Sequence, residues 1–77
     1  MTSSDKIIKK FKNSNKGHKF EDCEKILKFL EYEMKIGKGS HFKFLKKDRP
    51  VIMIARHNPV SPNAINDVIE AWEKENE

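Results

Sequence analysis

One short stretch near the middle of the chain constrains the fold most, because it turns the backbone and then alternates. Residues 38–40, Lys-Gly-Ser, have the composition of a tight turn, and the next four residues read His-Phe-Lys-Phe. Side chains of a β-strand point alternately to opposite faces of a sheet. If Phe42 and Phe44 face a core, His41 and Lys43 face away from it, so the pattern predicts a strand that starts at the histidine.

Two further strands are predicted on either side of this one. Residues 34–36 alternate apolar, basic and apolar side chains, which indicates a short first strand. The central strand is expected over residues 41–46, and the β-branched run of residues 51–55 is expected to form the third. Residues 47–50, Lys-Asp-Arg-Pro, have the composition of the turn that joins them.

The register of the second and third predicted strands follows from their hydrophobic pattern. A pairing in which residue numbers sum to 98 buries the isoleucines of the third strand and places His41 opposite His57. A sum of 97 places His41 opposite Arg56 instead. Because a one-residue slip exchanges the two faces of a strand, we favour the first register. Either register gives His41 a titratable or cationic neighbour.

Apolar residues at helical spacing predict three helices around these strands. Ser4 and Asp5 are suited to begin a first short helix. An apolar stripe predicts a second helix over residues 20–32, and Ser61 followed by Pro62 marks the start of a third. The order α-α-β-β-β-α predicts an α+β fold in which a three-stranded antiparallel sheet carries helices on one face.

The chain has 77 residues, enough for one domain. We expect an N-terminal helical arm and loop in residues 1–17 and a compact core in residues 18–77. Cys23, the only cysteine, lies in the apolar stripe of the second helix and is interpreted as a small buried hydrophobe. The unpaired cysteine, the polar first residues and the lack of a long apolar run predict a cytoplasmic protein without membrane contact.

The net charge is +4, and the basic residues gather in two segments. Residues 5–19 carry six lysines against one acid, and residues 35–57 carry five lysines and two arginines against Asp48 alone. A basic sheet surface suits a polyanion such as nucleic acid, although lysines also keep small proteins dispersed in water. The last helix ends in four glutamates, where the helix dipole disfavours negative charge; the sequence alone gives no reason for them.

An exposed histidine among basic residues suits cleavage of RNA through the ribose 2′-hydroxyl. That reaction requires a base for the 2′ proton, cations for the phosphate and an acid for the leaving oxygen. Histidine titrates near neutral pH and acts as base or acid, so His41 is the predicted catalytic residue. His57 either assists it or packs at the end of the third strand, and His18 is assigned no role.

The basic residues around this histidine are predicted to bind the RNA backbone, because cations stabilise the charge that develops on a phosphate. A compact turn also lets a phosphate approach the histidine closely. The predicted RNA-binding residues are Lys35, Lys38, Gly39, Ser40, Lys43 and Arg56. No carboxylates or cysteines at metal-ligand spacing accompany His41, so we expect no metal or other cofactor.

Residues 38–44 resemble the glycine-serine-histidine motif of HicA-type toxins from HicA–HicB toxin–antitoxin systems. Residues 54–57, Ile-Ala-Arg-His, resemble the end of that family's third strand, with alanine in place of its usual proline, and Pro62 falls where its last helix begins. The similarity covers roughly residues 20–72. It implies a fold like double-stranded-RNA-binding domains, metal-independent cleavage of mRNA through His41, and a HicB-type antitoxin partner that covers that histidine.

Two other functions are compatible with the sequence. A non-catalytic RNA-binding module would use the same basic face to recognise shape and backbone without breaking bonds. Its affinity for RNA would fall steeply with salt. A pure protein-interaction domain would bind no nucleic acid, even at low salt.

Overall fold

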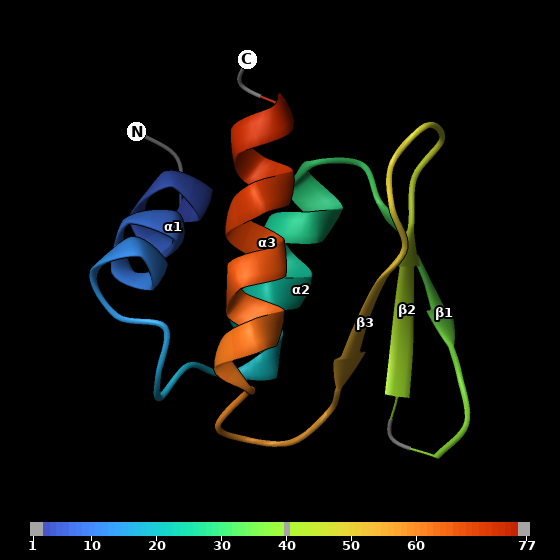
Figure 1. Cartoon of the computed structure of the whole chain (residues 1–77), viewed down its shortest axis with the longest axis horizontal. Coiled ribbons are helices and arrows are strands. Elements are labelled where there is room, and N and C mark those ends of the chain that lie inside the picture. Colours follow the sequence, from blue (N-terminus) through green and yellow to red (C-terminus); the bar gives the residue numbers. More distant parts are fainter. Residues whose placement is uncertain (1–2, 40, 76–77) are drawn as a thin grey trace.

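The computed structural model describes residues 3–39 and 41–75, and its elements follow the order α-α-β-β-β-α (Figure 1). The predicted α+β class and the predicted order are therefore confirmed. The elements are α1 (Ser3–Asn13), α2 (Phe20–Phe29), β1 (Glu33–Ile36), β2 (His41–Leu45), β3 (Ile52–Ala55) and α3 (Pro62–Glu75). No helix in this described part of the chain is both long and apolar enough to cross a bilayer.

The helices lie together on one face of an antiparallel sheet with strand order β1-β2-β3 (Figure 1). Four side chains of β2 and β3 are buried on that face, namely Phe42, Phe44, Ile52 and Ile54. The ring of Phe20, the first residue of α2, lies 5.1 Å from the ring of Phe42 between centroids. The alternation of buried and exposed residues along β2 is the one predicted, and it leaves His41 and Lys43 on the uncovered face.

Helix α1 packs against α2 and α3 on the side away from the sheet (Figure 1). Its apolar residues Ile8 and Phe11 are buried in the same core as the strand residues. The side chain of Lys12 forms an ion pair with Glu73 of α3. The N-terminal helix thus adds apolar side chains to the core.

The register of β2 and β3 differs from both predicted registers. Residues 41 and 55 are paired, so numbers sum to 96 and His41 lies opposite Ala55 rather than His57 or Arg56. The pairing is centred on Asp48, which adopts a left-handed φ of 63°. A shift of two residues leaves the isoleucines on the core face, so the hydrophobic pattern does not separate sums of 96 and 98; the turn decides between them.

Helix α2 ends at Phe29, earlier than the predicted Tyr32. Glu31 adopts a left-handed φ of 69°. Its N–H donates to the carbonyl of Lys28, and the N–H of Tyr32 donates to the carbonyl of Leu27, both at 2.9 Å. This is the Schellman pattern of a helix end, in which glycine usually holds the left-handed position. Because glutamate holds it here, the sequence carries no clear stop signal.

Helix α3 starts where its capping residue predicts. The hydroxyl of Ser61 accepts a hydrogen bond from the N–H of Ala64 at 3.3 Å, and Pro62 is the first helical residue. A side-chain oxygen at this position satisfies one of the N–H groups that a helix start leaves without a partner. The predicted start is confirmed.

The glutamates at the other end of α3 have basic partners from distant parts of the chain. Glu75 accepts hydrogen bonds from Lys46 Nζ at 2.7 Å and from Arg49 Nε at 2.8 Å. These bonds hold the pKa of the Glu75 carboxyl below its usual value. Glu73 pairs with Lys12, and the last glutamate, residue 77, lies outside the described residues. The cations offset the unfavourable interaction of the carboxylates with the helix dipole.

Cys23 is completely buried in α2, beside Ile26 and Leu27 in the same core. Burial, together with the neighbouring charge of Asp22, raises the pKa of its thiol to about 12. A thiol with so high a pKa is unreactive at neutral pH. The interpretation of Cys23 as a small buried hydrophobe is confirmed.

Candidate functional site

The face of the sheet turned away from the helices, called the open face below, carries three of the predicted site residues, Lys35, His41 and Lys43. Its strand residues are Glu33 and Lys35 from β1, His41, Lys43 and Leu45 from β2, and Met53 and Ala55 from β3. Lys35 lies opposite Lys43, and Lys43 lies opposite Met53. Directly opposed residues have Cβ atoms about 5 Å apart. The sheet therefore brings two exposed lysines into one row, with His41 two residues along β2.

The carbonyl oxygen of Lys38, in the turn between β1 and β2, orients the ring of His41. The backbone N–H of His41 donates to this oxygen at 3.2 Å, and the ring atom Nδ1 lies 3.3 Å from it. A carbonyl oxygen only accepts hydrogen bonds, so this contact assigns the proton of the neutral ring to Nδ1. The other ring nitrogen, Nε2, then carries a lone pair that can accept a proton.

Two glycines shape the turn that holds His41. Gly37 donates its N–H to the carbonyl of His41 at 2.8 Å, and a β-carbon at position 37 would lie 3.1 Å from that same oxygen. Gly39 has a φ of 61°, in the left-handed region that glycine adopts without steric penalty. Sequence reasoning selected Gly39 and Ser40 but missed Gly37, whose close contact depends on pairing with β2. Ser40 lies outside the described residues.

Arg56 and His57 follow β3, and neither is the cross-strand neighbour of His41. The guanidinium carbon of Arg56 lies 5.8 Å from the centroid of the Phe20 ring and 6.0 Å from that of Phe42. Both rings belong to the helix-covered side of the sheet, and both distances are typical of cation–π contacts. His57 is exposed beyond the end of β3. Arg56 therefore lies on the opposite side of the sheet from the row of Lys35 and Lys43.

Two exposed apolar residues near the basic row were missed by sequence reasoning. Met53 is 53% exposed and Val51 is 54% exposed. Their segment, residues 51–55, was predicted as the β-branched third strand, and neither residue was named as part of the site. Strict alternation with the buried residues Ile52 and Ile54 was the signal that places residue 53 on the open face.

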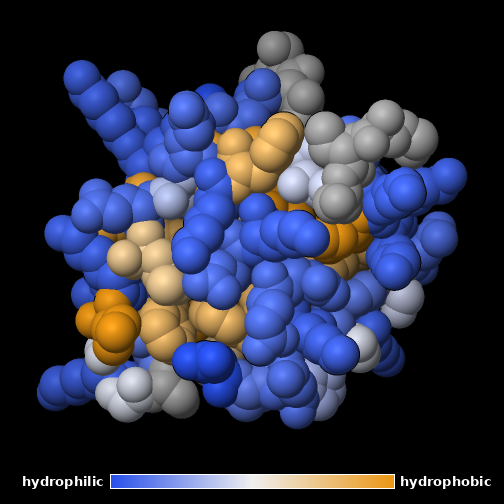
Figure 2. All heavy atoms as spheres, turned by 180° about the vertical axis from the view of Figure 1, so that it is seen from behind, coloured by the Kyte–Doolittle hydropathy of each residue, from blue (hydrophilic) through white to orange (hydrophobic). Residues whose placement is uncertain are grey.

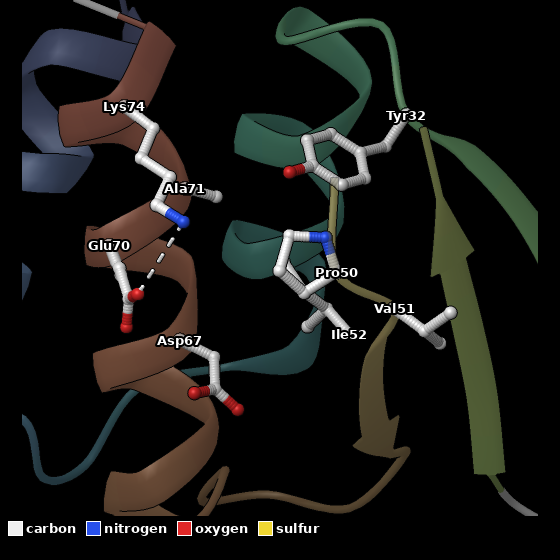
Figure 3. Close-up of a pocket in the computed structure, with 8 residues that line it drawn as sticks. All are labelled: Tyr32, Pro50, Val51, Ile52, Asp67, Glu70, Ala71 and Lys74. Atoms are coloured by element: carbon white, nitrogen blue, oxygen red, sulfur yellow. Dashed lines mark ion pairs between the residues drawn. The ribbon is translucent and has the colours of Figure 1, made fainter. Parts of the chain in front are cut away.

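A cavity of about 100 Å³ lies between α3 and the connection from β2 to β3 (Figure 3). Tyr32 and Pro50 face it from one side, and Asp67, Glu70 and Lys74 line it from α3. Burial and the charge of Glu70 raise the pKa of Asp67, while Lys74 pairs with Glu70. Two carboxylates against one ammonium disfavour a polyanion, and no predicted site residue lines this cavity.

Within the described ranges, no group of three or more histidine, cysteine, aspartate or glutamate side chains is placed to hold a metal ion. Comparison of the chain with known protein families, with curated proteins and with solved structures finds no match. The resemblance to HicA-type toxins therefore rests on the residues of this chain alone.

Proposed function

We propose that this protein is a HicA-type toxin, an endoribonuclease that cuts mRNA in the cytoplasm without a metal and uses His41 as its general base. The observation that carries the proposal is the orientation of His41. Its Nδ1 is engaged by the Lys38 carbonyl, which leaves Nε2 to accept a proton on a basic, exposed face. The succession of a helix, three antiparallel strands and a helix from α2 to α3 accords with the double-stranded-RNA-binding-like fold that the resemblance implies.

In the proposed reaction, the 2′ oxygen of a ribose attacks the adjacent phosphorus. Nε2 of His41 takes the 2′ proton, the bond from O2′ to phosphorus forms, and the bond from phosphorus to O5′ breaks. The products are a 2′,3′-cyclic phosphate and a 5′-hydroxyl end. The leaving oxygen takes its proton from an acid, and His57 is the candidate donor within this chain. General acid–base groups of this kind typically contribute about 10²- to 10⁴-fold in rate.

The proposed phosphate contacts divide between the sheet and the turn. Lys35 and Lys43 form one row on the open face, where their charges stabilise a phosphate as negative charge builds on it. Lys38 and the backbone of Gly39 belong to the turn that holds His41. Arg56 lies past the end of β3, so it contacts RNA that extends beyond the sheet.

The proposed cellular role is that of a toxin whose HicB-type antitoxin covers His41. This part of the proposal follows from the resemblance of residues 38–44 and 54–57 to HicA-type toxins. Production of the wild-type chain should arrest growth, and a small acidic protein encoded beside it should relieve the arrest. Relief that persists when the two proteins do not bind each other would contradict a covering antitoxin.

Cleavage of an mRNA transcript by the purified full chain in EDTA tests the proposal. Wild type should cut the transcript, and His41→Ala should cut it about 10²- to 10⁴-fold more slowly. His18→Ala is the matched control. His18 lies in the loop between α1 and α2, and its ring contacts Phe11 of α1 rather than the open face. Thermal melting checks that each variant is folded. Cleavage by His41→Ala at the wild-type rate would contradict the assignment of His41 as the catalytic base.

A non-catalytic RNA-binding module is the second candidate, and the row of Lys35 and Lys43 favours it. Two opposed lysines, whose Cβ atoms are about 5 Å apart, can hold a phosphate whether or not a bond is cut. This candidate predicts RNA binding by wild type without cleavage, and binding by His41→Ala with the same affinity. The same two proteins therefore distinguish it from the endoribonuclease.

A further inference from the structure

The open face is basic on β1 and β2 but apolar on β3. The side chain of Met53 continues the row formed by Lys35 and Lys43, and it is 53% exposed. In the neighbouring row, Ala55 lies opposite His41. On the side of the molecule that holds the sheet, at the left of Figure 2, apolar side chains interrupt a largely hydrophilic surface. Met53 and Ala55 of the edge strand β3 form what we call the apolar edge. It adjoins His41, the proposed catalytic residue, and the lysines proposed to bind phosphate.

The spacing of these residues matches the parts of a nucleotide. Lys43 and Met53 are directly opposed, with Cβ atoms about 5 Å apart. His41 and Lys43 stand two residues apart on one strand, which separates them by about 7 Å. A nucleotide whose phosphate contacts Lys43 can therefore reach Met53 with its base. The adjacent phosphate of the RNA strand can then reach His41.

Charge limits where an RNA strand can lie on this face. Glu33 is exposed at the far end of β1 and lies opposite Leu45. Its carboxylate repels phosphates from that end of the sheet. The remaining surface for a polyanion comprises the row of Lys35, Lys43 and Met53 and the adjoining end with His41.

We propose that Met53 contacts a nucleobase of the RNA substrate, and that the substrate is single-stranded where it meets this face. This inference rests on the proposed function. Single-stranded nucleic acids commonly bind by backbone contacts to cations and by stacking of bases on aromatic side chains. A methionine thioether is polarizable and also makes favourable contacts with aromatic rings, so it can contact a base in their place. A paired base in a duplex is stacked and does not offer its ring to the protein.

Binding of single-stranded RNA that carries one abasic site tests the contact. The full chain with His41→Ala is used so that the RNA is not cut, and the abasic site is moved stepwise along one oligonucleotide. Fluorescence anisotropy gives the Kd at each step. One abasic position should weaken binding by about two- to tenfold. Adding Met53→Ala should abolish the penalty at that position and leave the other positions unchanged.

Ile36→Ala in the same background is the matched control. Ile36 is 76% exposed but lies opposite Phe42 on the helix-covered side, so its variant should retain the penalty. A profile that Met53→Ala leaves unchanged would overturn the nucleobase contact while the proposed function stands. Absence of RNA binding at low salt would overturn both. A Met53→Ala variant that loses only a protein partner would assign the apolar edge to protein binding instead.

Discussion

The two turns of the sheet lie at its opposite ends and are held in different ways (Figure 1). The turn between β2 and β3 is fastened by side chains. Lys46 donates to the carbonyl of Leu30 and to Glu75, and Arg49 donates to Glu75 as well. We call this the fastened end. It ties the sheet to the C-terminal ends of both α2 and α3.

The turn between β1 and β2 carries His41 and is held by hydrogen bonds of its own residues. Gly37 donates to the carbonyl of His41, and His41 donates to the carbonyl of Lys38. Among the described residues, Lys38 and Lys43 form no ion pair. We call this the histidine end. The comparison shows that the cations of one end are used for stability, whereas those of the other are available to a ligand.

The largest effect on the rate of RNA cleavage is expected from Gly37→Val at the histidine end. The new β-carbon would lie 3.1 Å from the His41 carbonyl oxygen, so this oxygen must move by a few tenths of an ångström and disturb the turn that holds the imidazole. A displacement of about 1 Å at a reacting group lowers rates by about 10²-fold, so this smaller movement should slow cleavage by less than that factor. Gly17→Val is the control, because it strains the backbone at a φ of 77° away from the histidine end, while its β-carbon meets nothing within 4 Å. Equal rates for both variants would mean that the turn does not position the histidine.

A smaller effect is expected from Lys43→Ala, which removes one cation from the open face. RNA affinity should fall, and the slope of log K against log salt should become shallower by about 0.7. Lys25→Ala removes an exposed lysine of α2 instead and should leave the slope unchanged. An unchanged slope for Lys43→Ala would show that the row on the open face does not hold phosphate.

The smallest effect on cleavage is expected from Glu75→Gln at the fastened end, which should leave the rate unchanged. Hydrogen bonds from Lys46 and Arg49 lower the pKa of Glu75 in the folded protein. The carboxylate therefore contributes stability above its unfolded pKa, and that contribution is lost as pH falls through the lower, folded value.

Melting temperatures measured between pH 7 and pH 3 check this effect. Wild type should melt higher than Glu75→Gln at neutral pH, and the difference should vanish in acid. A difference that persists at the lowest pH would show that the ion pairs at the fastened end are not its source.

Local pattern predicted the layers of this fold but not the way its ends are held. The alternation around Phe42 and Phe44 was enough to separate the core face from the open face, and Ser61 was enough to start α3. The register was predicted wrongly because a two-residue shift changes no face, and the left-handed Asp48 decides it. The partners of Glu75 are far away in sequence, so no local pattern identifies them.

The site was predictable to the extent that strand alternation determines it. His41, Lys35 and Lys43 lie on the open face as expected. The exposed Met53 follows from the same rule once Ile52 and Ile54 are placed on the core face, but it was not recognised as a candidate site residue. The neighbour of the histidine was predicted wrongly, as His57 in the favoured register or Arg56 in the other, because it depends on a register that the hydrophobic pattern did not determine.

The central claim is that His41 takes a proton from a ribose 2′-hydroxyl. The most direct measurement uses an RNA oligonucleotide that wild type cuts at one mapped bond, and the same oligonucleotide with a single 2′-deoxy nucleotide on the 5′ side of that bond. If His41 takes this proton, the unmodified RNA yields a 2′,3′-cyclic phosphate and the 2′-deoxy RNA is not cut at that bond. Cleavage of the 2′-deoxy RNA at the same bond and the same rate would contradict it.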